Sequence, residues 1–343
     1  NFERMPLDAR ISVTGQGRID GFRIVPASVP PPEAPAEAEG VRELEVTVAG
    51  DLPGLLTLPT GDGPFPAVVL VHGSGPNDRD ETVGPNRPFL DLARGLAAAG
   101  VAVLRYDKRT RVEPDAFRDR AYSARDEVID DVLAGLALLR ARDDVDSDRL
   151  FVLGHSLGGL LGPRIAIEAG DLRGLVLLAA PARPLDDLVV EQVEYIAGLD
   201  GEIDPQERGQ IDALRSASKR IDDLDDADSA APAMLGLPES YWVDLNAHDP
   251  VAGARAFLES GETVLMIAQG GRDYQVTEAG DYSRWSTALN DHPRVLLRLY
   301  PDLNHLFIAG EGMATPQEYL RDAGRVHRDV IRDIARFIQQ PPA

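Results

Sequence analysis

Four short, wholly apolar runs recur between residues 67 and 178, and they constrain the fold of the chain more than any other feature. The runs are residues 67–71, 101–104, 150–153 and 175–178. Stretches with helical patterns separate them, at residues 89–99, 124–140 and 157–169. Continuous apolar runs of this length are typical of strands buried on both faces. Strands that alternate with helices pair through crossover connections, so we predict an α/β fold with a mostly parallel central sheet flanked by helices.

The alternation stops in the middle of the chain and then returns. Residues 183–262 show helical patterns, many acidic side chains and no clear buried strand. Strand-like runs reappear at 263–268 and 294–300, and an amphipathic helix is expected over 316–339. We therefore predict that residues 183–262 are a helical insertion that covers one edge of the sheet as a cap.

The N-terminal segment differs in composition from the rest. Residues 26–40 are rich in proline, alanine and glutamate, a composition that is typical of a solvated linker. We therefore expect residues 1–40 to be an N-terminal arm with a linker, and residues 41–343 to be the main domain. The first residue is Asn1 rather than methionine. A removed leader, which would place the protein outside the cytoplasm, or a trimmed end would each explain this.

The charge balance disfavours several kinds of partner. The chain has 57 acidic and 35 basic residues and a net charge of −22. Such a surface repels phosphate backbones, so we expect no nucleic-acid partner, and polyanionic substrates such as acyl-CoA are disfavoured. There is no cysteine, which excludes thiol catalysis and cysteine-ligated metals. No apolar run is long enough to suggest a membrane span.

The strongest chemical motif is Gly154-His155-Ser156-Leu157-Gly158, between the apolar run at 150–153 and the helical stretch at 157–169. A sharp turn between a strand and a helix exposes a serine hydroxyl, and glycines two residues to either side let the backbone close. The alternative is a glycine-rich turn of a nucleotide-binding unit. No Gly-x-Gly-x-x-Gly fingerprint or lysine-bearing phosphate loop accompanies it. We therefore predict Ser156 as a nucleophile.

A second glycine-rich loop, residues 71–76, follows the apolar run at 67–71. In hydrolases with such a serine turn, an N–H of this loop and the N–H after the nucleophile hold the oxyanion. We predict the N–H groups of Ser74 and Leu157 as the donors, with Gly75 as the alternative to Ser74. Gly73 and Gly75 keep the loop small. An ordinary turn is the other interpretation.

A serine nucleophile needs a histidine base and an orienting carboxylate, in the chain order Ser, Asp or Glu, His. Only His305 directly follows the last predicted core strand, where ligands bind in open α/β sheets. The alternative for it is a surface histidine in a loop. The other histidines fall in the two loops, the insertion, a position before a strand and the last predicted helix; they are His72, His155, His248, His292 and His327.

For the acid, Asp273 follows the strand-like run at 263–268 through a short loop at the same sheet edge. A loop-shaping aspartate is its alternative role. The competing carboxylates are Glu278, Asp281 and Asp302, and Asp302 is expected to shape the loop of His305.

Charged residues cluster near the predicted oxyanion loop. They are Arg79, Asp80 and residues 107–109. We expect a salt-bridge network that fixes the loop. An arginine that binds a substrate carboxylate is the alternative.

These motifs, taken together, resemble those of bacterial α/β-hydrolase esterases of the dienelactone-hydrolase-like and EstD-type groups. The resemblance covers about residues 42–340. The similar segments are 72–81, 105–109, 154–159, 271–276 and 303–306. It implies the α/β-hydrolase fold and a carboxylesterase for short- to medium-chain esters, with Ser156, Asp273 and His305 as the triad. Some relatives carry an additional N-terminal domain, in place of which we expect a short arm of about 40 residues here.

The expected reaction is acyl transfer to water, with a small-molecule ester as the substrate and with no metal or organic cofactor. The same triad can cleave amides or thioesters, so a peptidase, an amidase and a thioesterase are alternatives. A catalytically silent binding protein on the same fold is another. The sequence does not indicate an oligomeric state or a natural ester.

Overall fold

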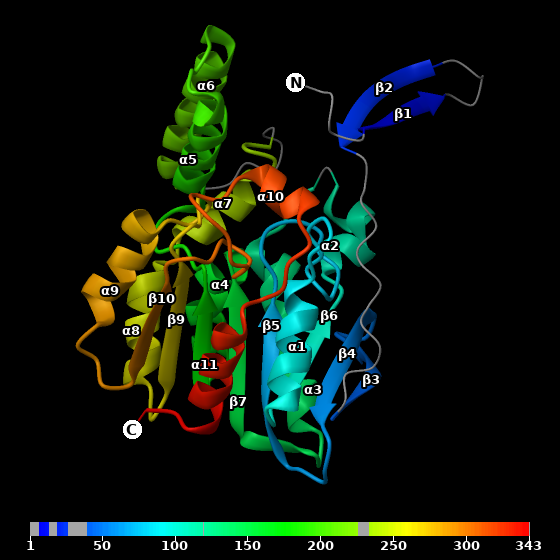
Figure 1. The fold of residues 1–343 in the computed structure, drawn as a ribbon, viewed down its shortest axis with the longest axis vertical. Coiled ribbons are helices and arrows are strands. Elements are labelled where there is room, and N and C mark those ends of the chain that lie inside the picture. Colours follow the sequence, from blue (N-terminus) through cyan, green and yellow to red (C-terminus); the bar gives the residue numbers. More distant parts are fainter. Residues whose placement is uncertain (1–6, 14–18, 27–39, 119, 226–232, 343) are drawn as a thin grey trace.

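The structure, a computed structural model, describes residues 7–13, 19–26, 40–118, 120–225 and 233–342. Its centre is an eight-stranded sheet with the order β10-β9-β8-β7-β5-β6-β4-β3 (Figure 1). All neighbouring pairs are parallel except the two that involve β4. The strands are β3 (Val41–Val48), β4 (Leu52–Pro59), β5 (Phe65–Val71), β6 (Ala102–Tyr106), β7 (Val145–His155), β8 (Gly174–Leu178), β9 (Val264–Gly270) and β10 (Val295–Tyr300).

Helices cover both faces of this sheet. Helices α1 (Pro88–Ala98) and α11 (Arg328–Gln339) pack on one face, and α3 (Asp130–Arg140), α4 (Leu157–Ala169) and α8 (Pro250–Glu259) on the other. Successive residues of β7 supply the two faces in turn: Phe151 packs in the core under α1 and α11, and Val152 in the opposite core. The predicted mostly parallel sheet flanked by helices is confirmed. No helix within the described ranges is both long and apolar enough to cross a membrane.

The middle of the chain adds helices above the carboxyl ends of the strands. Helices α5 (Leu185–Ala197) and α6 (Pro205–Asp222) pack against each other and project away from the sheet, and α7 (Glu239–Asn246) lies at their base (Figure 1). The predicted insertion, residues 183–262, also includes α8, which packs on α4 and flanks the sheet. The remaining short helices are α2 (Arg109–Val112), η1 (Pro114–Phe117), η2 (Arg125–Ile129), η3 (Gly198–Asp200), η4 (Glu278–Tyr282), α9 (Ser283–Leu289) and α10 (Pro316–Arg321).

The N-terminal arm contains one antiparallel pair, β1 (Leu7–Val13) and β2 (Ile19–Pro26), which is a separate two-stranded sheet. Residues 27–39, which make up most of the predicted linker, lie outside the described part of the chain.

One prediction about the end of the chain is wrong. Residues 316–339 form two helices, α10 and α11, rather than one. The Asn86 side chain fixes the break, because its Nδ2 donates to the carbonyl oxygens of Tyr319 and Asp322 and its Oδ1 accepts from the N–H of Gly324. These bonds satisfy backbone groups at the end of α10 that a continuing helix would have used itself. His327 therefore caps the start of α11 instead of lying inside a helix.

Candidate active site

Ser156 lies at the junction between β7 and α4, at the carboxyl end of the central sheet. Its backbone has φ +53° and ψ −117°, a conformation that a residue with a side chain rarely adopts and that surrounding contacts must hold. One such contact is the hydrogen bond from its N–H to the carbonyl oxygen of Leu178, at 3.0 Å. The strained turn separates the serine side chain from both the strand and the helix, as a nucleophile requires.

The neighbouring glycines are required for space rather than for backbone angle. A Cβ on Gly154 would collide with the carbonyl oxygen of Gly158, and a Cβ on Gly158 would collide with that of Val71. A Cβ on Gly159 would lie 2.6 Å from the Cβ of Ala180. Helix α4 therefore starts in direct backbone contact with β5 and β7, and this contact fixes the position of Ser156.

His305 and Asp273 form a buried pair at the same edge of the sheet. Nδ1 of His305 lies 2.7 Å from Oδ2 of Asp273. The other oxygen of Asp273 accepts hydrogen bonds from the N–H groups of Gln275 and Val276, and Nε2 of Gln269 donates to Oδ2. The carboxylate is therefore held in one orientation, with Nδ1 of the imidazole engaged and Nε2 left as the nitrogen able to act as a base.

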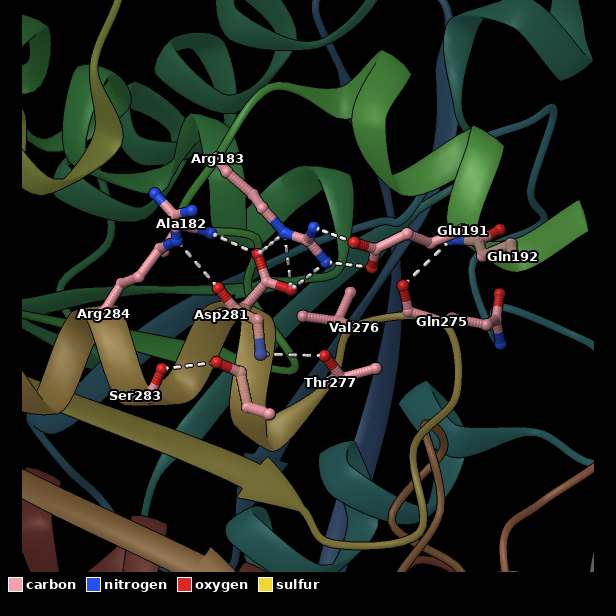
Figure 2. Close-up of polar contacts among 12 residues, drawn as sticks. Ala182, Arg183, Glu191, Gln192, Gln275, Val276, Thr277, Asp281, Ser283 and Arg284 are labelled. Atoms are coloured by element: carbon pink, nitrogen blue, oxygen red, sulfur yellow. Dashed lines mark hydrogen bonds and ion pairs between the residues drawn. The ribbon is translucent and has the colours of Figure 1, made fainter. Parts of the chain in front are cut away.

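The three competing carboxylates do not contact His305. Asp281 accepts hydrogen bonds from the Arg183 guanidinium and from the N–H of Ala182, as Figure 2 shows. Glu278 and Asp302 are exposed. Of the four predicted candidates for the acid, Asp273 is the one that lies beside His305.

A cavity of about 550 Å³ connects these groups. Ser74, Ser156 and His305 all line it, while His248, His292 and His327 do not. Its walls are otherwise mainly apolar: Val83, Leu185, Leu188, Val189, Leu235, Leu237, Trp242, Val276, Leu306 and Leu320. No arginine or lysine among the described residues lines it, and no group of three or more described His, Asp or Glu side chains is placed to hold a metal ion.

The loop after β5 closes this cavity beside the serine. A Cβ on Gly73 would lie 3.2 Å from the Cβ of Ser156, so the loop and the nucleophile are in contact. The N–H of Gly73 is already engaged, because it donates to Oε1 of Glu81 at 2.6 Å. Within the described part of the chain, the N–H groups of Ser74 and Leu157 donate to no protein atom. Gly75 has φ +94°, a conformation that favours glycine at this turn.

Two buried residues, Glu81 and His155, contact each other in the site, and the sequence did not predict this contact. Nδ1 of His155 lies 2.9 Å from Oε2 of Glu81, and its Nε2 lies 3.0 Å from the carbonyl oxygen of His305. Burial disfavours the charged imidazole of His155, but the Glu81 carboxylate outweighs it and raises the pKa of His155. Burial likewise opposes the charge on Glu81, but His155 lowers the pKa of that carboxyl. The sequence signal was weak: a glutamate eight residues after a loop glycine.

The predicted salt-bridge network is present beside the loop, except that Arg109 does not take part in it. Arg79 pairs with Asp107 at 3.1 Å, and Arg105 pairs with Asp80. Lys108 is buried and donates to the carbonyl oxygen of Gly73 at 3.1 Å. Arg109, in contrast, pairs with Asp131 of α3 and does not contact the loop.

Helix α5 forms a wall of the cavity and is tied to the segment that carries Asp273. Arg183 lies between Asp281 on one side and Glu191 of α5 on the other (Figure 2). Gln192 of α5 donates to the carbonyl oxygen of Gln275 at 3.0 Å. The ring of Tyr195 stacks on that of Tyr274, with centroids 4.8 Å apart. These contacts place α5 directly over the acid.

Comparisons with known proteins agree with this architecture. The chain is 40% identical to esterase EstD of Thermotoga maritima over 339 residues, which cover 98% of this chain and 77% of that protein. An esterase of Pyrococcus furiosus has 16% identity and a TM-score of 0.51, covering 88% of this chain and 91% of the other. An acylaminoacyl peptidase of Pyrococcus horikoshii has 16% identity and a TM-score of 0.52, covering 88% and 41%. These two structures share the fold.

The resemblance to bacterial esterases is confirmed by the Thermotoga relative. The model of the alpha/beta hydrolase family matches residues 68–323, a range that includes Ser156, Asp273 and His305. The chain therefore belongs to the alpha/beta hydrolase family.

Proposed function

We propose that this protein is a serine carboxylesterase that hydrolyses short- to medium-chain carboxylic esters with Ser156, His305 and Asp273. The observation that carries the proposal is that a strained serine turn and an imidazole backed by a buried carboxylate line one apolar cavity. The 40% identity to an esterase along nearly the whole chain supports the choice of ester substrates.

The first step is the attack of the Ser156 hydroxyl on the ester carbonyl. Nε2 of His305 takes the hydroxyl proton, while Asp273 accepts the hydrogen bond from Nδ1–H and stabilises the imidazolium that forms. The Asp273 carboxylate stays ionised and fixes the tautomer. Its bonds from the N–H groups of Gln275 and Val276 keep it in place during the transfer.

The oxyanion of the tetrahedral intermediate would be bound by the N–H groups of Ser74 and Leu157. Neither N–H donates to another described residue, so both remain available to a substrate. Leu157 is the first residue of α4, where the positive end of the helix favours negative charge. Ser74 lies in the loop that contacts the Cβ region of Ser156.

Collapse of the intermediate breaks the bond between the acyl carbon and the alkoxy oxygen. The imidazolium of His305 gives its proton to the leaving alcohol, and the acyl group remains bound to Ser156. A water molecule then attacks the acyl-enzyme, its proton passes to His305, and the same two N–H groups bind the second oxyanion. Collapse of this second intermediate breaks the bond between the acyl carbon and Oγ of Ser156, and the imidazolium of His305 returns its proton to Oγ. The carboxylic acid leaves and the free serine is restored.

The cavity supports uncharged substrates of modest size. Its volume of about 550 Å³ is within the range that holds small organic ligands. The lining is mainly apolar and has no arginine or lysine among the described residues, and His155, which also lines it, is paired with Glu81. It therefore offers no free counter-ion to a substrate carboxylate or phosphate. Within the predicted cap, residues 183–262, helix α5 above all would shape the acyl and alcohol sites, and its movement would control access, whereas α8 flanks the sheet.

Turnover of p-nitrophenyl esters of increasing acyl length, measured beside the matching p-nitroanilide, tests this function. We expect hydrolysis of the short and medium esters, a fall for the longest chains and much slower cleavage of the anilide. Ser156→Ala should abolish all of it. An anilide cleaved faster than its ester would make the protein an amidase, and ester turnover that survives in Ser156→Ala would refute the proposal.

A further inference from the structure

We propose that two buried charged side chains, Glu81 and Lys108, are positioning residues that hold Gly73 from opposite ends and thereby aim the N–H of Ser74 at the oxyanion. This inference rests on the proposed function. It adds residues that act through the backbone of Gly73 and set the geometry of the N–H group that binds the oxyanion.

Glu81 holds the amide side of Gly73. Its Oε1 accepts from the N–H of Gly73 at 2.6 Å, and its side chain is buried. Its other oxygen, Oε2, lies 2.9 Å from Nδ1 of His155, the residue before the nucleophile. Glu81 therefore joins the oxyanion loop to the serine turn through a single carboxylate.

Lys108 holds the carbonyl side of the same residue. Its Nζ donates to the oxygen of Gly73 at 3.1 Å and lies 2.8 Å from Oε1 of Glu127. Glu127 in turn accepts from the hydroxyl of Tyr241 at 2.6 Å. Nδ2 of Asn77 also donates to the oxygen of Gly73, at 3.1 Å.

Because the peptide bond is planar, the hydrogen bond from Lys108 also fixes the orientation of the Ser74 N–H. The carbonyl of Gly73 and the N–H of Ser74 belong to one peptide group, and in a trans peptide they point in opposite directions. With the oxygen held by Lys108, the N–H of Ser74 must point away from Lys108. The ammonium group also polarises that peptide, which makes the N–H a stronger donor.

The contacts of His155 define its protonation state. Its two ring nitrogens face Oε2 of Glu81 and the carbonyl oxygen of His305. An ionised carboxylate and a carbonyl can only accept hydrogen bonds, so acceptors beside both ring nitrogens favour the doubly protonated imidazolium. The pKa of His155, which the adjacent Glu81 raises against the effect of burial, agrees with an imidazolium.

We call Glu81, His155, Lys108 and Glu127 the clamp. Their charges cancel in two pairs, Glu81 with His155 and Lys108 with Glu127. Because each is a neutral pair, neither attracts a charged substrate. A buried ion pair is weak evidence of stabilisation, since apolar residues of similar volume often serve as well. The contacts that Glu81, Lys108 and His155 make with the backbone of Gly73 and His305 indicate a positioning role instead.

The first test removes the grip on the carbonyl. Lys108→Met alone leaves Glu127 buried without its cation, so the double variant Lys108→Met/Glu127→Gln is used, which removes both charges together. We expect kcat to fall by about tenfold to a hundredfold with KM within about twofold, and the affinity for a trifluoromethyl ketone, which mimics the tetrahedral intermediate, to fall in parallel with kcat/KM.

Arg109→Met is the matched control, because Arg109 is the next residue and pairs with the buried Asp131 rather than with the loop. It should lower thermal stability and leave kcat unchanged. A folded double variant with wild-type kcat and wild-type affinity for the ketone would overturn the role of Lys108. So would a rise in KM with kcat unchanged.

The second test separates the charge of Glu81 from its hydrogen bond. In Glu81→Gln the amide oxygen can still accept from Gly73, and the amide nitrogen can donate to a neutral His155. In Glu81→Ala both contacts are lost. We expect a smaller loss of kcat in Glu81→Gln than in Glu81→Ala, and ¹⁵N NMR should find both nitrogens of His155 protonated in the wild type but not in Glu81→Gln.

Equal kcat in wild type and Glu81→Ala, or a neutral His155 in the wild type, would overturn the role of Glu81. The NMR measurement needs no turnover. If the wild type hydrolyses no ester, the proposed function fails, while the protonation of His155 still reports on the clamp.

Discussion

Two pairs of imidazole and carboxylate lie beside Ser156, and they differ in one respect that decides their chemistry. In the pair of His305 and Asp273, the carboxylate lies 2.7 Å from Nδ1, and Nε2 is left to the cavity. In the pair of His155 and Glu81, the corresponding distance is 2.9 Å, but Nε2 faces the carbonyl oxygen of His305. An imidazole can pass a proton to and from a substrate only if one nitrogen faces the reacting groups rather than a fixed backbone acceptor. The first pair is therefore suited to catalysis and the second to holding the backbone.

The largest effect should come from breaking the first pair. His305→Ala removes the base, and Asp273→Asn allows the wrong imidazole tautomer, so each should lower kcat by about 10⁴-fold. Steady-state hydrolysis of p-nitrophenyl acetate measures this. His292→Ala and His327→Ala, whose rings do not line the cavity, should retain wild-type turnover. Full activity in Asp273→Asn would mean that another carboxylate orients the base.

A third buried histidine, His72, sharpens the comparison, because the nearby Glu81 carboxylate does not offset the effect of burial on its ring. Burial lowers the pKa of His72 to about 4. The unfolded chain then binds this proton at a higher pH than the folded one, so stability falls as the pH drops from about 6.5 to about 4, by about 3 kcal/mol for this group. Urea unfolding at several pH values tests it. His72→Asn should flatten this part of the profile, and an unchanged profile would contradict the assignment.

His155 should respond in the opposite direction. Its raised pKa means that its stabilising contribution is complete below the unfolded value and is lost as the pH rises through the folded value. Glu81, with a lowered pKa, contributes above its unfolded value and loses that contribution as the pH falls. The pair therefore stabilises the fold most at mildly acidic pH, between the two unfolded values.

A smaller effect on activity is expected from disrupting the second pair at its histidine. His155→Asn removes the imidazolium but keeps the serine, the base and the acid, so kcat should fall by about tenfold, far less than in His305→Ala. Stopped-flow acylation by p-nitrophenyl acetate gives the relevant rate. A loss as large as that of His305→Ala would show that the two pairs are not functionally distinct.

The smallest effect should come from Asp302→Asn. Asp302 is exposed, three residues before His305, and makes no contact with the imidazole. Its turnover of p-nitrophenyl acetate should stay within about twofold of wild type, since exposed charges contribute little. A damaging Asp302→Asn together with a harmless Asp273→Asn would reverse the assignment of the acid.

The two pairs also differ in where their residues lie relative to the strands, and this explains what the sequence could predict. Ser156, Asp273 and His305 each follow a strand of a parallel sheet, and the carboxyl ends of such strands meet at one edge. Glu81 does not directly follow a strand but lies far along the loop between β5 and α1. Its contact with His155 depends on the path of the loop after β5, which local patterns do not encode. The same limit applies to the break between α10 and α11, which Asn86 fixes from a distant part of the chain.

Labelling with a fluorophosphonate tests the central claim most directly, because the reagent reacts with a serine that is activated by a base and an oxyanion site. The account predicts that the folded wild type gains one phosphonyl group, that peptide mapping places it on Ser156, and that Ser156→Ala gains none. A folded wild type that remains unlabelled, or a Ser156→Ala variant labelled to the same extent, would contradict it.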